Sequence, residues 1–183
     1  VRLLRALNIP VELYHFNEGH ALFAGFELIR EKMEAGLTFR QAFAATKAEV
    51  VFTTHTPVKA GNEIHQISDL LEQGVGLEVM GEAEFAELGG NPFEMTVAAL
   101  RLSRKANAVA KLHGRTAAQM WAHVEDGAEI IPITNGIHMP SWQDPRIAEW
   151  MPSGDSSALW DITRELKNEL IAYIQEKTGQ KLA

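Results

Sequence analysis

Apolar and polar positions along this chain predict four strands separated by helices. Short apolar runs and alternating stretches predict strands at residues 11–16, 49–54, 106–111 and 129–133. The intervals carry apolar residues at helical spacing, as in TFRQAFAATKA, where Thr38 is predicted to be the N-cap. Strands that alternate with helices predict an α/β fold, with a Rossmann-like parallel sheet and flanking helices.

The remaining segments predict further helices and one exposed stretch. VRLLRALN, at the start, has the pattern of the last two turns of a helix, so we expect the chain to be a piece of a longer protein. Residues 64–90 predict a short helix, QISDLLEQG, and then a Gly- and Glu-rich excursion into solvent. Asn91 before Pro92 predicts the start of the next helix. The tail predicts two more helices, at about 145–151 and 157–177.

Composition narrows the class of protein. Hydrophobic residues make up 46% and charged residues 22% of the 183 residues, which is typical of a globular domain. The net charge of −7, without a basic cluster, argues against a nucleic-acid or anionic-membrane partner. No apolar run approaches the roughly 20 residues of a membrane span. The absence of cysteine excludes disulfides and cysteine-ligated metals, and it fits a cytoplasmic protein.

The first polar turn does not predict a metal site. His15, Glu18 and His20 are spaced His-x-x-Glu-x-His, which matches neither metalloprotease helix pattern. Strand alternation also directs His15, together with Val11 and Leu13, toward the interior or a cleft wall. The sequence contains no Gly-x-Ser-x-Gly elbow, Gly-x-Gly-x-x-Gly run or Walker A motif, so it predicts neither an acyl-transfer triad nor a complete nucleotide site.

Polar residues follow three of the predicted strands, in the turns NEGH, THTPVKAG and TNG. Ligands of open parallel sheets bind at the carboxyl ends of the strands. A lone histidine at a strand end is more often structural, but Thr56 and two preceding threonines surround His55 with hydroxyls. Such a loop suits a polyhydroxylated ligand, because every sugar hydroxyl taken out of water needs a partner, and the amide of Asn135 can serve one too. Glu18 could accept two sugar hydroxyls, or could instead favour the N-terminal dipole of the next helix.

Four sequence blocks resemble the α-glucan phosphorylases, most of all the shorter bacterial and archaeal type. In order, the blocks are HFNEGHALF, VFTTHTPVKAGNE, EMTVAALRLSRKANAVAKLHG and ITNGIHMPSW. The resemblance covers nearly the whole chain and implies an internal fragment of a two-lobed GT-B-type glycosyltransferase. Its substrates would be inorganic phosphate and an α-1,4-glucan or maltooligosaccharide. Reversible phosphorolysis would release the terminal glucose as glucose 1-phosphate with retained configuration.

The resemblance also implies roles for single residues. His55 matches the histidine beside the transferred glucose, whose carbonyl faces the anomeric centre and whose ring contacts the 6-hydroxyl. A carbonyl dipole there would stabilise developing oxocarbenium charge. Asn135 matches an asparagine that holds the same hydroxyl. Glu18 and His20 match an acidic-x-His pair on the acceptor-sugar side, where animal and plant forms have Asp in place of Glu18. Thr56 belongs to the same predicted substrate-binding set.

By the same resemblance, residues 1–134 form the later part of the N-terminal lobe, and residues 135–183 form the hinge and the first helices of the C-terminal lobe. Lys59 stands where Pro is usual and Glu94 where Asn is common, but neither departure touches the main site assignments. The family cofactor, pyridoxal phosphate, would be held by residues outside this chain. The fragment alone is therefore expected to be inactive, and the longer protein could form a homo-oligomer.

Two alternatives remain open at this point. A nucleotide-sugar glucan synthase shares the two-lobed architecture and would differ by a donor-nucleotide site outside this chain. A non-catalytic glucan-binding module would bind glucan through exposed tryptophans, although packing is the more frequent role for each of them. The tryptophans are Trp121, Trp142, Trp150 and Trp160.

Overall fold

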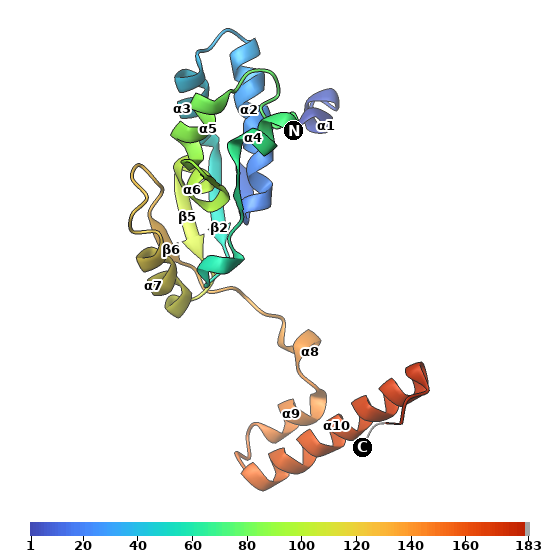
Figure 1. Cartoon of the computed structure of the whole chain (residues 1–183). Coiled ribbons are helices and arrows are strands. Elements are labelled where there is room, and N and C mark those ends of the chain that lie inside the picture. Colours follow the sequence, from blue (N-terminus) through green and yellow to red (C-terminus); the bar gives the residue numbers. More distant parts are fainter. Residues whose placement is uncertain (182–183) are drawn as a thin grey trace. The chain divides into compact units, whose positions relative to one another are not determined.

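The computed structural model describes residues 1–181, and the chain divides into two compact units, Val1–Asn135 and Gly136–Ala183 (Figure 1). The first unit contains a four-stranded sheet with its helices and a short two-stranded sheet. The second unit contains helices. None of the helices in the described part of the chain is both long enough and apolar enough to cross a membrane.

The four-stranded sheet confirms the predicted parallel α/β architecture. Its strands lie in the order β1 (Tyr14–Asn17), β2 (Val50–Thr54), β5 (Lys105–Ala108) and β6 (Ile130–Pro132), and every neighbouring pair is parallel. All four lie where the sequence predicts strands, although β1 begins at Tyr14 rather than at residue 11. The strands follow one another across the sheet in the order of the sequence. Right-handed connections between them would therefore all pass over the same face of the sheet.

The connections between these strands hold the helices and the second sheet. Before β2 come α1 (Arg2–Ala6), the 3₁₀ turn η1 (Gly19–Ala21), α2 (Leu22–Glu34) and α3 (Phe39–Glu49). Between β2 and β5 come η2 (Lys59–Gly61), β3 (Ile64–His65), α4 (Ile67–Glu72), α5 (Glu82–Gly89), β4 (Phe93–Glu94) and α6 (Met95–Arg101). Helix α7 (Lys111–Met120) joins β5 to β6.

Helix α3 begins where the sequence predicts. Thr38 accepts a hydrogen bond from the backbone N–H of Gln41, and the Gln41 side chain accepts one from the Thr38 backbone N–H. This capping box satisfies two of the N–H groups that a helix start leaves unpaired. The helix then runs directly into β2, one of the two inner strands of the four-stranded sheet.

The core lies on one face of the sheet. Phe16, Phe52 and Ala106 are register partners on that face, and all three are buried. A Cβ added to Gly25 of α2 would come within 2.4 Å of Leu102 Cδ2 and 3.1 Å of Phe16 Cε2, so the helix backbone lies directly against the core. On the opposite face of the sheet, side chains such as His15, Asn17 and Lys105 are exposed.

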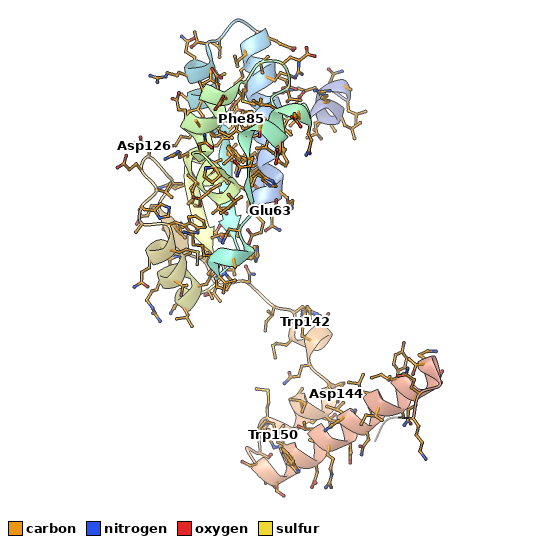
Figure 2. All side chains as sticks on the ribbon, viewed as in Figure 1. Glu63, Phe85, Asp126, Trp142, Asp144 and Trp150 are labelled. Atoms are coloured by element: carbon orange, nitrogen blue, oxygen red, sulfur yellow. The ribbon has the colours of Figure 1, made fainter. Side chains whose placement is uncertain are left out.

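Two predictions for the segment between β2 and β5 are wrong. The expected solvent excursion contains α5, whose Phe85, labelled in Figure 2, is buried. Its ring packs edge-on against Phe26 and Phe93. The helix expected from Asn91 begins at Met95 instead. The residues before it form β4, which pairs antiparallel with β3, and a long-range strand pairing of this kind leaves no local signal in the sequence.

His15 does not point into the interior, which was one of the two directions predicted for it. The strand begins only at Tyr14, so Val11 and Leu13 do not set its alternation. Phe16 occupies the buried face and His15 is exposed on the other. The His15 Nε2 lies 2.7 Å from Thr53 Oγ1, whose hydroxyl donates to Asn107 Oδ1 at 2.7 Å. The open face therefore carries a row of hydrogen-bonded side chains across β1, β2 and β5.

The second unit consists of α8 (Met139–Trp142), α9 (Pro145–Trp150) and α10 (Ser156–Thr178), and the last two confirm the two helices predicted for the tail. Asp144 caps α9 through the Arg146 N–H, and Asp155 caps α10 through the Ser157 N–H. The Arg146 guanidinium joins the two helices, because it bonds Asp144 as well as Glu169 of α10 at 2.7 Å. These hydrogen bonds lower the pKa of both carboxyls and raise the pKa of Arg146.

Candidate functional site

The predicted site residues of the first unit lie at the carboxyl ends of the parallel strands. Thr54, Ala108 and Pro132 are aligned across β2, β5 and β6, so the segments that follow them leave the sheet at one edge. His55 comes directly after Thr54. The backbone N–H of Asn135 donates to the Val109 carbonyl at 3.1 Å, which holds the turn after β6 beside the end of β5.

Glu18 connects the turn after β1 to the turn after β2. Its Oε1 accepts a hydrogen bond from the backbone N–H of His55 and another from the Thr56 hydroxyl at 3.1 Å. The Glu18 backbone N–H donates to the Thr53 carbonyl at 2.9 Å. Three of the five predicted site residues, Glu18, His55 and Thr56, are therefore in direct contact through one carboxylate.

The backbone of Glu18 has an unusual conformation. Its φ of 66° and ψ of 172° lie in a region that is populated almost only by glycine. A residue with a side chain loses of the order of 1–3 kcal/mol there and persists only where its surroundings hold it. The side chain makes no capping hydrogen bond to the 3₁₀ turn that follows. The hydrogen bonds of the Glu18 side chain thus lie with the His55 turn rather than with the next helix.

His20 and Thr56 line a small hollow beside this carboxylate. The hollow has a volume of about 160 Å³, below the roughly 300–1,000 Å³ of most small-molecule sites. His55 is exposed and is not one of its lining residues. The lining residues are Glu18, Gly19, His20, Thr56, Gly61, Asn62, Glu63, Met95 and Thr96. The first unit by itself therefore offers an open, polar crevice rather than an enclosed pocket.

Asn62 is a structural member of this crevice that the sequence did not single out. Its Nδ2 donates to the Val58 carbonyl at 3.0 Å, and its Oδ1 accepts from the buried Thr96 hydroxyl of α6 at 2.8 Å. The side chain thereby ties the loop after His55 to the core. A Cβ on Gly61 would meet Thr56 Cγ2 at 2.9 Å, so the close approach of these two residues in the loop depends on the glycine.

The exposed tryptophans lie in the second unit. Trp142 is 82% exposed on α8 and Trp160 is 69% exposed on α10. Trp150 donates its indole N–H to the Asp155 carbonyl, and Trp121 is buried in the first unit at the end of α7. Packing thus accounts for Trp121, whereas Trp142 and Trp160 present apolar rings to solvent.

A larger hollow lies away from the polar turns. Its volume is about 510 Å³, and Arg2, Arg30 and the segment 74–80 contribute to its walls. Both guanidinium groups already bind the buried Glu27 carboxylate, with N–O distances of 2.6–2.9 Å. Hydrogen bonds from Arg2, and then from Arg30, lower the pKa of Glu27 to about 2. We assign this hollow to the salt-bridge network rather than to a ligand.

The described residues do not form a metal site. No group of three histidine or carboxylate side chains in residues 1–181 is arranged to hold a metal ion. A pyridoxal phosphate site needs an available lysine. Lys32 is paired with Glu49 at 2.8 Å, and Lys47 donates to the Asp126 carbonyl at 2.7 Å. These two lysines are therefore engaged within the fold.

Comparison with known proteins shows to which family the sequence of this chain is similar. No family model matches the chain. It is 37% identical over 186 residues to a maltodextrin phosphorylase of Thermococcus litoralis, covering 92% of this chain and 22% of that protein. A glycogen phosphorylase of Mycobacterium tuberculosis is 36% identical over 191 residues, covering 90% of this chain and 22% of its own length. The chain is related to the α-glucan phosphorylases.

The resemblance read from the four sequence blocks is thereby confirmed. A third similar protein, an uncharacterized protein of Methanocaldococcus jannaschii, is 41% identical over 171 residues and is covered over 31% of its length. The chain therefore spans between about a fifth and a third of the length of these similar proteins, given coverages of 22% and 31%. The polar turns NEGH, THTPVKAG and TNG lie within three of the four sequence blocks that resemble the phosphorylases.

Proposed function

We propose that this chain is an internal part of an α-1,4-glucan phosphorylase. The longer protein would catalyse reversible phosphorolysis of terminal α-1,4-linked glucose to glucose 1-phosphate, with retention, in carbohydrate metabolism in the cytoplasm. The observation that carries the proposal is 36–37% identity to a maltodextrin and a glycogen phosphorylase over at least 90% of the chain. The hydrogen bonds that join Glu18, His55 and Thr56 add support, because these residues come from two of the matching blocks.

In this proposal the first unit supplies the glucose-binding edge of an N-terminal lobe, and the second unit belongs to the hinge and the C-terminal lobe. The His55 carbonyl would face the anomeric centre, where a fixed dipole stabilises developing positive charge. The His55 ring and the Asn135 amide would share the 6-hydroxyl. His20, Thr56 and Glu18 would line the acceptor-sugar side. His20 and Thr56 border the same 160 Å³ hollow, which supports grouping them.

The crevice is too small and too open to enclose a sugar by itself, so the proposal requires further polypeptide to complete it. Pyridoxal phosphate would be supplied by that additional polypeptide, and when bound it would provide the acid–base chemistry at the substrate phosphate. The residues of this chain would bind and orient the glucosyl unit. The 183 residues alone should accordingly release no glucose 1-phosphate from maltoheptaose and phosphate.

The test compares two glucosyl donors in separate reactions with the full-length protein. One reaction contains maltoheptaose and inorganic phosphate, and the other contains a nucleotide-glucose and maltoheptaose. We expect phosphate-dependent glucose 1-phosphate in the first reaction and no chain elongation in the second. Elongation from the nucleotide sugar, without phosphorolysis, would establish the glucan synthase alternative instead.

The exposed rings of Trp142 and Trp160 favour one second candidate, a glucan-binding role for the 183-residue chain itself. Aromatic faces stack on sugar rings, and binding would quench their fluorescence. Titration of the chain with maltoheptaose tests this candidate. Saturable quenching that disappears in a Trp142→Ala, Trp160→Ala double variant would support glucan binding, and an unchanged spectrum would remove it.

A further inference from the structure

The backbone conformation at Glu18 favours glycine, whereas the hydrogen bonds from the His55 turn are accepted by its carboxylate. The backbone conformation, with φ of 66° and ψ of 172°, favours glycine. A glycine there would relieve the strain but would have no carboxylate. The carboxylate that the chain carries instead accepts two hydrogen bonds from the turn after β2. Strain that is retained at one residue indicates that its side chain does something that glycine cannot do.

The two hydrogen bonds hold the main chain on both sides of His55. The His55 N–H belongs to the peptide that precedes its Cα, and Thr56, which follows, is held through its hydroxyl at 3.1 Å. The third link, from the Glu18 N–H to the Thr53 carbonyl at 2.9 Å, fixes Glu18 itself to β2. The backbone around His55 is therefore held by two hydrogen bonds to the same Glu18 oxygen, one on each side of the His55 Cα.

We infer that Glu18 is a positioning residue, whose carboxylate fixes the His55 turn at the carboxyl end of β2 and so holds the His55 backbone beside the crevice that Glu18 and Thr56 line. This inference deepens the proposed phosphorylase function and rests on it for the identity of the reaction. In this role Glu18 acts through His55, in place of the direct contact with the acceptor sugar that the resemblance implies for it. Charge-assisted hydrogen bonds to a carboxylate are among the stronger ones, so the anchor is suited to this task.

The test compares four variants of the full-length protein. Glu18→Gln keeps an amide oxygen that can accept from both donors. Glu18→Ala removes the anchor and keeps the backbone strain, whereas Glu18→Gly removes both. Glu72→Ala is the control, because Glu72 is exposed on α4. The measurements are kcat and KM for maltoheptaose phosphorolysis, and amide hydrogen exchange of the peptide that covers residues 52–57.

We expect Glu18→Ala and Glu18→Gly each to lower kcat about 10- to 100-fold, the loss that misplacement of a positioned group causes. The KM for maltoheptaose should change less than about threefold, because the anchor acts through His55 rather than on the glucan. Glu18→Gln should stay within about fivefold of the wild-type kcat, because it keeps both hydrogen bonds. Exchange in residues 52–57 should rise in the Ala and Gly variants and stay unchanged in Glu18→Gln and Glu72→Ala.

Three results would overturn the inference. A raised KM with an unchanged kcat would show that Glu18 contacts the glucan directly. Recovery of activity in Glu18→Gly relative to Glu18→Ala would show that strain, rather than the lost hydrogen bonds, causes the defect. Unchanged exchange in both variants would show that the carboxylate does not hold the turn. If the wild-type protein shows no phosphorolysis, the proposed reaction fails, and the exchange measurement still decides whether Glu18 holds the His55 turn.

Discussion

The backbone N–H of His55 donates a hydrogen bond to the carboxylate of Glu18, a residue 37 positions earlier in the chain. The two residues follow neighbouring parallel strands, β1 and β2, so the contact joins two loops at one edge of the sheet. The sheet brings the ends of its strands together, and the carboxylate then fixes how one loop sits against the other. This contact ties the fold of the first unit to its candidate site.

The row of side chains on the open face of the sheet should contribute to stability. The single hydroxyl proton of Thr53 is donated to Asn107 Oδ1, so Thr53 must accept from His15, which assigns the Nε2–H tautomer to that ring. Thr53 is only 6% exposed. Thr53→Val should lower the free energy of unfolding by about 0.5–1.5 kcal/mol. The measurement is urea denaturation, and Thr53→Ser, which keeps the hydroxyl, is the control. Equal stability of Thr53→Val and the wild type would contradict a stabilising role of the Thr53 hydroxyl.

Acid should weaken the first unit through Glu27. Its folded pKa of about 2 lies below the ordinary value of 4.5, because Arg2 and Arg30 hydrogen-bond its ionised form. A lowered folded pKa stabilises the fold fully above the unfolded pKa, and this contribution is lost as the pH falls from about 5 to 2. The loss should be on the order of 2–3 kcal/mol.

The matched variant is Glu27→Gln, which keeps the size of the side chain and removes its titration. Its unfolding free energy should lie below that of the wild type at pH 7, and the gap should close toward pH 2. The measurement is denaturant unfolding of both chains across this range. A gap that is the same at pH 7 and pH 3 would mean that the charge of Glu27 does not stabilise the fold.

Gly25→Ala should destabilise the chain by overpacking. The added Cβ would lie 2.4 Å from Leu102 Cδ2, and Leu102 is fully buried. Extra methyl groups in a packed core cost about 1–3 kcal/mol because neighbours must shift. Thermal unfolding should show a lowered Tm. Gly136→Ala is the control, since its Cβ would meet nothing within 4 Å, and an equal effect of both variants would refute close packing of α2 on the sheet.

Asn135→Ala in the full-length protein should impair the use of ordinary glucosyl units. If Asn135 holds the 6-hydroxyl, the variant loses one neutral hydrogen bond, worth about 0.5–1.5 kcal/mol in kcat/KM. A substrate whose terminal glucose lacks the 6-hydroxyl should lose much less. The measurement is kcat/KM for both substrates in both proteins, and equal losses on the two substrates would reject this role.

Local patterns in the sequence were sufficient for much of the first unit. The strand at Val50–Thr54 and the cap at Thr38 follow from short-range chemistry, namely an apolar run and a side-chain oxygen before a helix. Contacts between distant segments were not predictable in this way. Helix α5 was missed because Phe85 and Leu88 alone carry its buried face, amid glycines and glutamates that indicate a loop.

The candidate site shows the same division. The sequence indicated that polar turns follow the strands, because each apolar or alternating stretch gives way to a run of polar residues. It could not reveal that Glu18 uses its carboxylate on the His55 N–H, nor that Asn62 ties the loop to Thr96. Each of those hydrogen bonds joins residues more than 30 positions apart, and only the packed sheet brings them together.

We propose that the turns after β1, β2 and β6 together bind one glucosyl unit. A crystal structure of the full-length protein with maltoheptaose and phosphate would test this proposal directly. We expect the His55 ring and the Asn135 amide both to lie within hydrogen-bond distance of the 6-hydroxyl of one glucosyl unit, with the Glu18 carboxylate still bonded to the His55 N–H. A glucosyl unit that contacts neither residue would contradict it.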